Sequence, residues 1–176
     1  RYIEGGVITH FSQPDWERIL HIDVQGPEGD LTIIVEPMER RSNLLLVKDG
    51  IILDCIRRVG ADENRYRVSL PGKPYVPPPP QTGKLNPFSL TLESVMGLFE
   101  QNDDAKRKTH QVLTSRLLGI SPLLAKEIVY RASGATEQKA SAAEPQPLLI
   151  ALKEKLAPLQ RREWQPGVAE NERGIQ

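Results

Sequence analysis

The chain has 176 residues, enough for one ordinary domain or two small ones, and its 23 basic residues balance its 23 acidic residues. No global charge marks it as a binder of nucleic acids or membranes, so any anion-binding site must be local. The single cysteine, Cys55, excludes an intrachain disulfide framework and predicts a cytoplasmic location. No apolar run is long enough to span a membrane and no signal-peptide pattern is present, so we expect no membrane partner. Because the sequence opens at Arg1 and enters strand-like sequence quickly, we expect it to be part of a longer protein.

Residues 5–59 predict an antiparallel β-sheet. Short apolar or alternating runs, typical of strands, occupy residues 7–11, 18–24, 31–35, 44–47 and 51–56. Asp49-Gly50 separates the last two runs and predicts a tight hairpin. In the second run, alternation places Leu20, Ile22 and Val24 on one face and predicts that His21 faces outward.

A charged turn interrupts this sheet between two of its most apolar strands. It reads Glu36-Pro37-Met38-Glu39-Arg40-Arg41-Ser42-Asn43. Pro37 cannot donate to a sheet ladder, so strand pairing must stop or bulge there. One interpretation is a solvated connection in which the arginines pair with Glu36 or Glu39. The other is a polyanion contact, because two adjacent guanidiniums can fork onto phosphate oxygens.

After the last strand, Arg57 and Arg58 either protect an edge strand from self-association or extend the basic strip. Residues 60–89 then predict a long loop that contains the run Pro77 to Pro80. A run of prolines holds an extended conformation, and we expect a strap that lays Tyr75 and Val76 on the apolar surface of the sheet.

From residue 89 onward the apolar period becomes helical. We expect a short amphipathic helix first, then a helix from about residue 104 to 117 with N-cap chemistry at 102–104, and another over 148–159. Between them, Gly119 ends one helix, Ser121 caps the next, Pro122 takes its first position and Ala125 allows close packing. This layout predicts a helix-hairpin-helix, either as a structural corner or as a phosphate clamp.

The predicted fold class is therefore α+β, with an antiparallel β-sheet or sandwich followed by a small helical domain. We place the β domain with its strap at residues 1–88, the helix-hairpin-helix domain at 89–160 and an extended segment returning towards the β domain at 161–176.

No catalytic constellation is visible. The three histidines, at positions 10, 21 and 110, are scattered and form no metal-ligand spacing. There is no phosphate-loop signature, no serine elbow and no cysteine with a plausible base. We expect a protein that is not an enzyme and that needs no cofactor or metal.

Several ordered blocks of the sequence resemble the NFACT family. They are Ile3-Glu4-Gly5-Gly6-Val7-Ile8, the charged turn with Leu44-Leu45-Leu46-Val47, Lys48-Asp49-Gly50-Ile51-Ile52-Leu53-Asp54, Arg65-Tyr66-Arg67, Pro71-Gly72-Lys73-Pro74-Tyr75-Val76-Pro77-Pro78-Pro79, Lys84-Leu85-Asn86-Pro87 and Gly119-Ile120-Ser121-Pro122-Leu123-Leu124-Ala125. The family comprises the bacterial RqcH proteins, long labelled fibronectin-binding protein A, and their eukaryotic ribosome-quality-control relatives. The resemblance covers nearly the whole chain.

The resemblance implies part of an NFACT-N domain, similar to the N-terminal domain of formamidopyrimidine-DNA glycosylases, followed by the helix-hairpin-helix domain. It also implies binding to the obstructed large ribosomal subunit with its stalled peptidyl-tRNA, and to tRNA, in bacteria alanyl-tRNA. Through these partners the family promotes untemplated C-terminal alanine tails, while the ribosome performs the peptidyl transfer. The proline nucleophile of the glycosylases is not implied, because the first part of the family's domain is missing.

In that family an Asp-Arg pair in the charged turn engages tRNA, and Glu39 and Arg40 occupy the matching positions. Glu39 keeps the negative charge but adds a methylene group. We expect the tRNA contacts at Glu39, Arg40, Arg41 and Asn43, and candidate phosphate contacts at Arg57, Arg58, Gly119 and Ser121.

Two alternative functions stay open. The first is a surface adhesin for fibronectin, the family's older label, against which the lone cysteine and the missing secretion signal argue. The second is a helix-hairpin-helix module that binds DNA or RNA without catalysis; a base-excision repair activity is also conceivable from the glycosylase-like fold, and we expect none.

Overall fold

The computed structural model describes residues 2–100, 106–163, 166–167, 170–171 and 174–175. The chain divides into two compact units, residues 1–80 and residues 81–176. The division falls within the proline-rich stretch, earlier than the predicted boundary at residue 88. The reason is that Leu85 already pairs with the helical unit, since its backbone bonds to Arg116 and Leu118.

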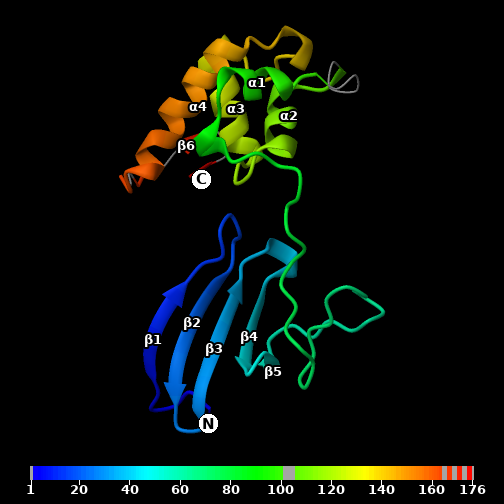
Figure 1. Ribbon diagram of the computed structural model, residues 1–176, viewed down its shortest axis with the longest axis vertical. Helices are drawn as coiled ribbons and strands as arrows, with labels where there is room; N and C mark the ends of the chain where they lie inside the picture. Colours follow the sequence, from blue (N-terminus) through cyan, green and yellow to red (C-terminus); the bar gives the residue numbers. More distant parts are fainter. Residues whose placement is uncertain (1, 101–105, 164–165, 168–169, 172–173, 176) are drawn as a thin grey trace. The chain divides into compact units, whose positions relative to one another are not determined.

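The first unit is built on a five-stranded antiparallel sheet whose strands lie side by side in chain order (Figure 1). The strands are β1 (Val7–Ser12), β2 (Leu20–Gly26), β3 (Gly29–Glu36), β4 (Asn43–Lys48) and β5 (Ile51–Cys55). These spans confirm the predicted meander. β3 ends at Glu36, as Pro37 requires.

The hairpin between β4 and β5 follows from its two central residues. Asp49 and Gly50 both lie in the left-handed region, with φ of 51° and 74°. Two left-handed residues give a primed turn, whose twist matches that of the strands that it joins.

One face of the sheet carries a buried cluster of Ile19, Ile34, Leu45, Val47 and Ile52. His21 lies on this face, where its ring meets the Tyr75 ring edge-on at 6.5 Å between centroids. The prediction that His21 faces outward is therefore wrong. Alternation gives two faces, and here the opposite face is also apolar, so the pattern could not tell which one the chain would cover. That opposite face leaves Phe11, Leu20 and Leu44 exposed.

Residues 57–80 contain most of the predicted strap, and from here on the name strap means these residues. They are fastened to the sheet by backbone hydrogen bonds. The amide of Ile52 donates to the carbonyl of Lys73, that of Gly72 to Ile52, and that of Tyr75 to Gly50. Tyr75 packs against the buried cluster, which confirms its predicted place on apolar surface.

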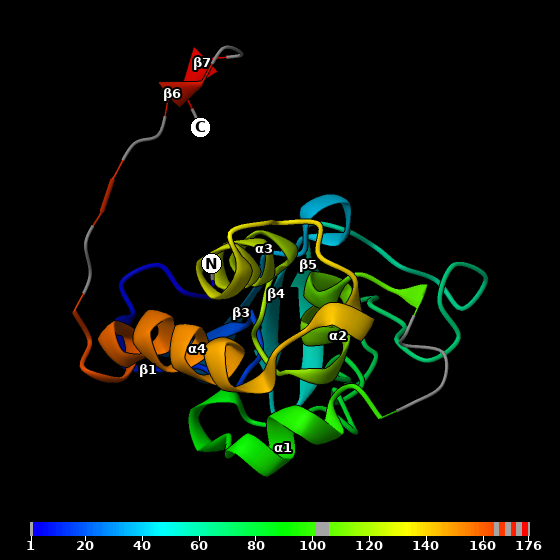
Figure 2. The same ribbon diagram turned by 90° about the horizontal axis from the view of Figure 1, so that it is seen from above.

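The second unit contains four α-helices among the described residues. They are α1 (Leu92–Gly97), α2 (Thr109–Arg116), α3 (Pro122–Ser133) and α4 (Pro145–Gln160), with short 3-10 turns at Pro87–Ser89 and Ala140–Ala142. α3 packs against both α2 and α4, and α1 packs on α4 (Figure 2). Their shared core includes Val95, Leu113, Ile128 and Leu152, which are fully buried.

α2 begins at Thr109, later than the predicted residue 104, and the predicted N-cap at 102–104 lies outside the described residues. Instead, the Gln111 side chain accepts a hydrogen bond from the Lys108 amide at the start of the helix. Residues 170–171 and 174–175 form a two-stranded ribbon, β6 with β7. The predicted return of 161–176 towards the β domain stays a prediction.

Candidate functional site

The charged turn is a compact, hydrogen-bonded structure. Glu39–Arg41 form one 3-10 turn, closed by the Ser42 amide, which donates to the Glu39 carbonyl at 3.1 Å. The Ser42 hydroxyl accepts from the Met38 amide at 2.9 Å. Glu39 has a φ of 51°, a left-handed conformation that a glutamate adopts less readily than an aspartate or asparagine. The hydrogen-bonded backbone of the turn therefore fixes the positions of the Cα atoms of Arg40 and Arg41.

Arg40 and Arg41 present their guanidiniums to solvent. Both residues are exposed, and neither guanidinium makes a hydrogen bond or ion pair within the described part of the chain. The interpretation in which Glu36 neutralises them is wrong, because Glu36 pairs with an arginine of the strap instead. Two adjacent positive charges thus remain available to an external anion.

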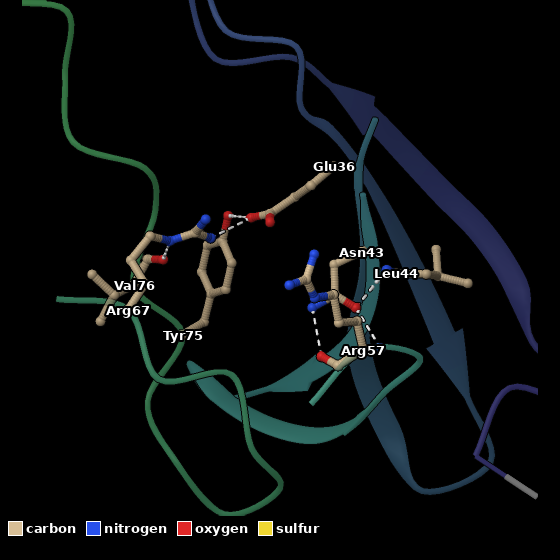
Figure 3. A network of polar contacts seen from close by, with 7 residues as sticks. All are labelled: Glu36, Asn43, Leu44, Arg57, Arg67, Tyr75 and Val76. Carbon is tan, nitrogen blue, oxygen red and sulfur yellow. Dashed lines mark hydrogen bonds and ion pairs between the residues drawn. The ribbon is translucent and has the colours of Figure 1, made fainter. Parts of the chain in front are cut away.

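A buried polar network, drawn in Figure 3, joins the end of β3 to the strap. Glu36 is 3% exposed, and its Oε1 accepts from Arg67 Nη2 at 2.6 Å and from the Tyr75 hydroxyl at 2.8 Å. Arg67 Nε also donates to the Val76 carbonyl at 2.7 Å. The Arg67 guanidinium stands 5.9 Å from the centre of the Tyr75 ring. The side chains of Arg67 and Tyr75 thus join the strap to Glu36 at the end of β3.

Burial raises the pKa of Tyr75 well above its usual range, and the hydrogen bond and negative charge of Glu36 raise it further. The Arg67 charge opposes this shift and is outweighed. The phenol therefore stays protonated and keeps donating to Glu36 at every physiological pH.

Asn43 has a structural place in the turn. Its side chain is buried, its Oδ1 accepts from the amides of Arg57 and Leu44, and its Nδ2 donates to the Arg57 carbonyl. These bonds lock the start of β4 to the first residue of the strap (Figure 3). Both ends of the amide are thus already used inside the protein.

The two arginines after β5 differ from each other. The Arg57 guanidinium donates to the Arg40 carbonyl and pairs with Glu63, whereas Arg58 is exposed. Arg57 therefore stabilises the backbone of the charged turn. Arg58 presents its charge on the surface.

A pocket of about 440 Å³ opens between the charged turn and the strap. Its walls include Arg41, Asn64, Tyr66, Arg67 and Pro78, and Glu36 lies in its lining. The pattern of residue types did not identify Tyr66 and Arg67 as site residues. The only signal was the block Arg65-Tyr66-Arg67, which marked the family without indicating a role.

The hairpin candidates lie in the second unit. Gly119 has a φ of 67°, and Ser121 caps α3 through its Oγ, which accepts from the Leu124 amide at 3.2 Å. Pro122 follows at the first helical position and Ala125 is fully buried, as the sequence predicts. The geometry at these residues is that of a tight helical corner.

The described residues contain no group of three or more His, Cys, Asp or Glu side chains arranged to hold a metal ion. No helix in the described part of the chain has the length and apolar character needed to cross a membrane.

Comparison with known families and proteins gives consistent matches. A family model described as NFACT N-terminal and middle domains matches residues 1–175. The "Rqc2 homolog RqcH" of Bacillus subtilis (strain 168) is 32% identical over 139 residues, covering 75% of this chain and 24% of that protein. The protein of the same name from Streptococcus suis (strain 05ZYH33) is 34% identical over 119 residues, covering 64% of this chain and 21% of that protein. The chain thus spans a quarter or less of the length of these relatives.

Solved structures agree with the α+β fold. The fibrinogen binding protein from Staphylococcus aureus superimposes with a TM-score of 0.68 at 24% identity, covering 96% of this chain and 58% of that one. The N-terminal domain of the fibronectin-binding protein PavA from Streptococcus pneumoniae gives a TM-score of 0.56 at 26% identity, covering 99% and 59%.

Proposed function

Because the chain belongs to the NFACT family, we propose that it binds tRNA within a ribosome quality control factor. In this proposal the whole protein engages the obstructed large ribosomal subunit together with tRNA, alanyl-tRNA in bacteria, and promotes C-terminal alanine tailing of the stalled chain. The similarity to proteins named Rqc2 homolog RqcH supports this class of function.

The observation that carries the proposal is the pair of guanidiniums at Arg40 and Arg41, which have no partner among the described residues and stand on a hydrogen-bonded turn. A guanidinium is always charged and forks onto phosphate oxygens, so two of them on a fixed backbone form a local phosphate-binding surface. The turn is stabilised by the hydrogen bond from the Met38 amide to the Ser42 hydroxyl and by the hydrogen bond from Arg57 to the Arg40 carbonyl. The arginines therefore meet RNA without first having to order their own backbone.

Glu39 completes the contact in this proposal. It stands where the family has an aspartate and lies exposed beside Arg40. Its carboxylate accepts from a ribose hydroxyl, a group that RNA has and DNA lacks.

The chain contributes binding and positioning to this activity, with no catalytic step of its own and no cofactor. The ribosome performs the peptidyl transfer. In the proposal, Arg58 provides an additional phosphate contact through its positive charge. The hairpin at Gly119 and Ser121 provides another, because an exposed helix N-terminus favours an anion.

The test is tRNA binding by this chain and by its Arg40→Ala variant across a salt titration, with duplex DNA as competitor. We expect preferential binding to tRNA, weakened by salt because phosphate contacts release counterions. Arg40→Ala should lower the affinity and flatten the salt dependence by about one ion. An Arg18→Ala variant, which removes an exposed arginine of the same unit, is the matched control.

Folded protein that binds no tRNA, or binds it equally with and without Arg40, contradicts the proposal. If duplex DNA competes as well as tRNA, the activity is that of a generic helix-hairpin-helix module that binds nucleic acid through phosphates.

A surface adhesin is a second candidate, supported by the likeness to the fibronectin-binding protein PavA. Immobilised fibronectin separates the two candidates. Saturable binding that survives Arg40→Ala, without binding to tRNA, would favour the adhesin.

A further inference from the structure

The pocket between the charged turn and the strap is built like a site for a small planar ligand. We propose that it binds one unpaired nucleotide of an RNA strand, with the base stacked on Tyr66, an exocyclic amine at Glu36 and the phosphate at Arg41. The inference rests on the proposed RNA-binding function and assigns its ligand at this pocket. The volume of about 440 Å³ lies within the range of small-ligand sites, about 300–1,000 Å³.

Tyr66 is the stacking surface. Tyr66 is 59% exposed and lines the pocket, so its ring is accessible to a ligand. The turn that carries it is fixed, because Asn64 Oδ1 accepts from the amides of Tyr66 and Arg67, both at 3.0 Å. An aromatic ring on a fixed turn stacks an unpaired base with little loss of conformational freedom.

Arg41 is the phosphate contact. Three arginines line the pocket, but Arg67 is paired with Glu36, and Arg57 is paired with Glu63. Arg41 alone of the three has no hydrogen bond or ion pair from its guanidinium to another described residue. Arg41 is exposed and directly follows Arg40 in the same 3-10 turn.

Glu36 is the buried group that reads the base. Its Oε1 accepts two hydrogen bonds, from Arg67 and Tyr75, while its Oε2 accepts none from the described residues. A carboxylate oxygen held in this way accepts from an amino group. Adenine and cytosine offer an exocyclic amine, whereas the corresponding position of uracil is a carbonyl oxygen, which the carboxylate repels.

The strap network keeps these three groups together. Tyr66 and Pro78 lie on either side of the segment that Arg67 and Tyr75 fasten to Glu36. Arg67 and Tyr75 are therefore positioning residues for the pocket, and Tyr66, Arg41 and Glu36 are the contacts.

The experiment measures binding of single-stranded hexanucleotides of adenosine, cytidine and uridine to the 176-residue chain by fluorescence anisotropy. We expect the Tyr66→Ala variant to bind the adenosine and cytidine oligomers about tenfold more weakly, in keeping with the loss of one stacked base. Tyr66→Phe should bind nearly as the parent does. The matched control is Tyr130→Ala, which removes a tyrosine of similar exposure, 54%, from α3.

The unsubstituted chain should prefer the cytidine to the uridine oligomer by roughly threefold to tenfold, the value of one hydrogen bond. Equal affinities for cytidine and uridine would overturn the role of Glu36. Equal affinities of the parent and Tyr66→Ala would overturn the pocket.

Binding to intact tRNA separates this inference from the proposed function. If tRNA binding depends on Arg40 and the hexanucleotides do not bind, the pocket assignment fails and the proposed function stands. If hexanucleotides bind through Tyr66 while tRNA does not bind, the proposed function fails and the pocket assignment stands.

Discussion

Replacing Arg67 by methionine removes the positive partner of a carboxylate that is only 3% exposed. Loss of one partner of a buried ion pair costs about 3–5 kcal/mol, because the other charge stays buried and unpaired. The Tyr75 hydroxyl still donates to Glu36 at 2.8 Å in the variant, so we place the loss at the lower end, about 3 kcal/mol. The Val76 carbonyl also loses its donor.

The measurement is urea unfolding followed by the fluorescence of Trp16, which lies in the first unit, in a chain that carries Trp164→Phe. The double variant Glu36→Gln/Arg67→Met leaves no buried charge, so it should lose only about 1 kcal/mol. Arg57→Met is the matched control. It breaks the half-exposed pair with Glu63 and the exposed hydrogen bond to the Arg40 carbonyl, and it should cost about 1 kcal/mol. If Arg67→Met changes the free energy of unfolding by under about 0.5 kcal/mol, or if the double variant is as unstable as the single one, the network does not hold the strap as argued.

Three further predictions concern other features of the fold. Burial and Glu36 raise the pKa of Tyr75 in the folded chain, so its contribution to the free energy of unfolding should be constant up to about pH 10 and be lost at higher pH. Tyr75→Phe should therefore lose less stability than the parent above about pH 10, measured by urea unfolding at a series of pH values. The same loss of stability in both proteins would contradict the raised pKa. Gly50→Ala should lower the free energy of unfolding by about 1 kcal/mol in the same assay. An added Cβ meets no atom within 4 Å, but the alanine must adopt a φ of 74°. An unchanged stability would show that the turn relaxes. Ser121→Ala should lower the thermal stability of the helical unit by about 1 kcal/mol, since the Leu124 amide loses its acceptor, whereas Ser121→Asp should retain it; equal losses in both variants would rule out the cap.

The local features of the fold were predictable because short-range chemistry decides them. Pro37 ends a strand, Asp49-Gly50 makes a primed turn, and Ser121 with Pro122 starts a helix, each through atoms only a few residues apart. The order of the strands followed from the same short connections.

The partner of Glu36 was not predictable in this way. Arg40 and Arg41 are near it in sequence, yet Arg67, 31 residues away, forms the ion pair. Which arginine reaches a carboxylate depends on where the strap lies, and hydrophobic periodicity carries no information about a segment of prolines and polar residues. The pocket was missed for the same reason, because its two walls come from the charged turn and the strap.

The buried network also has a consequence for the order of events in folding. The sheet assembles from hairpins of neighbouring strands, whereas the strap can dock only after Glu36 meets partners 31 and 39 residues further along the chain. Closing so long a loop is entropically costly and is rewarded only once the contacts form, so we expect the pocket to appear last and to open first. A ligand that touches both walls binds only the closed form, and it therefore stabilises the strap in proportion to the logarithm of its concentration. Slower hydrogen exchange at the amides of Tyr75 and Arg67 would then report occupancy of the pocket, even though neither residue is a contact of the ligand.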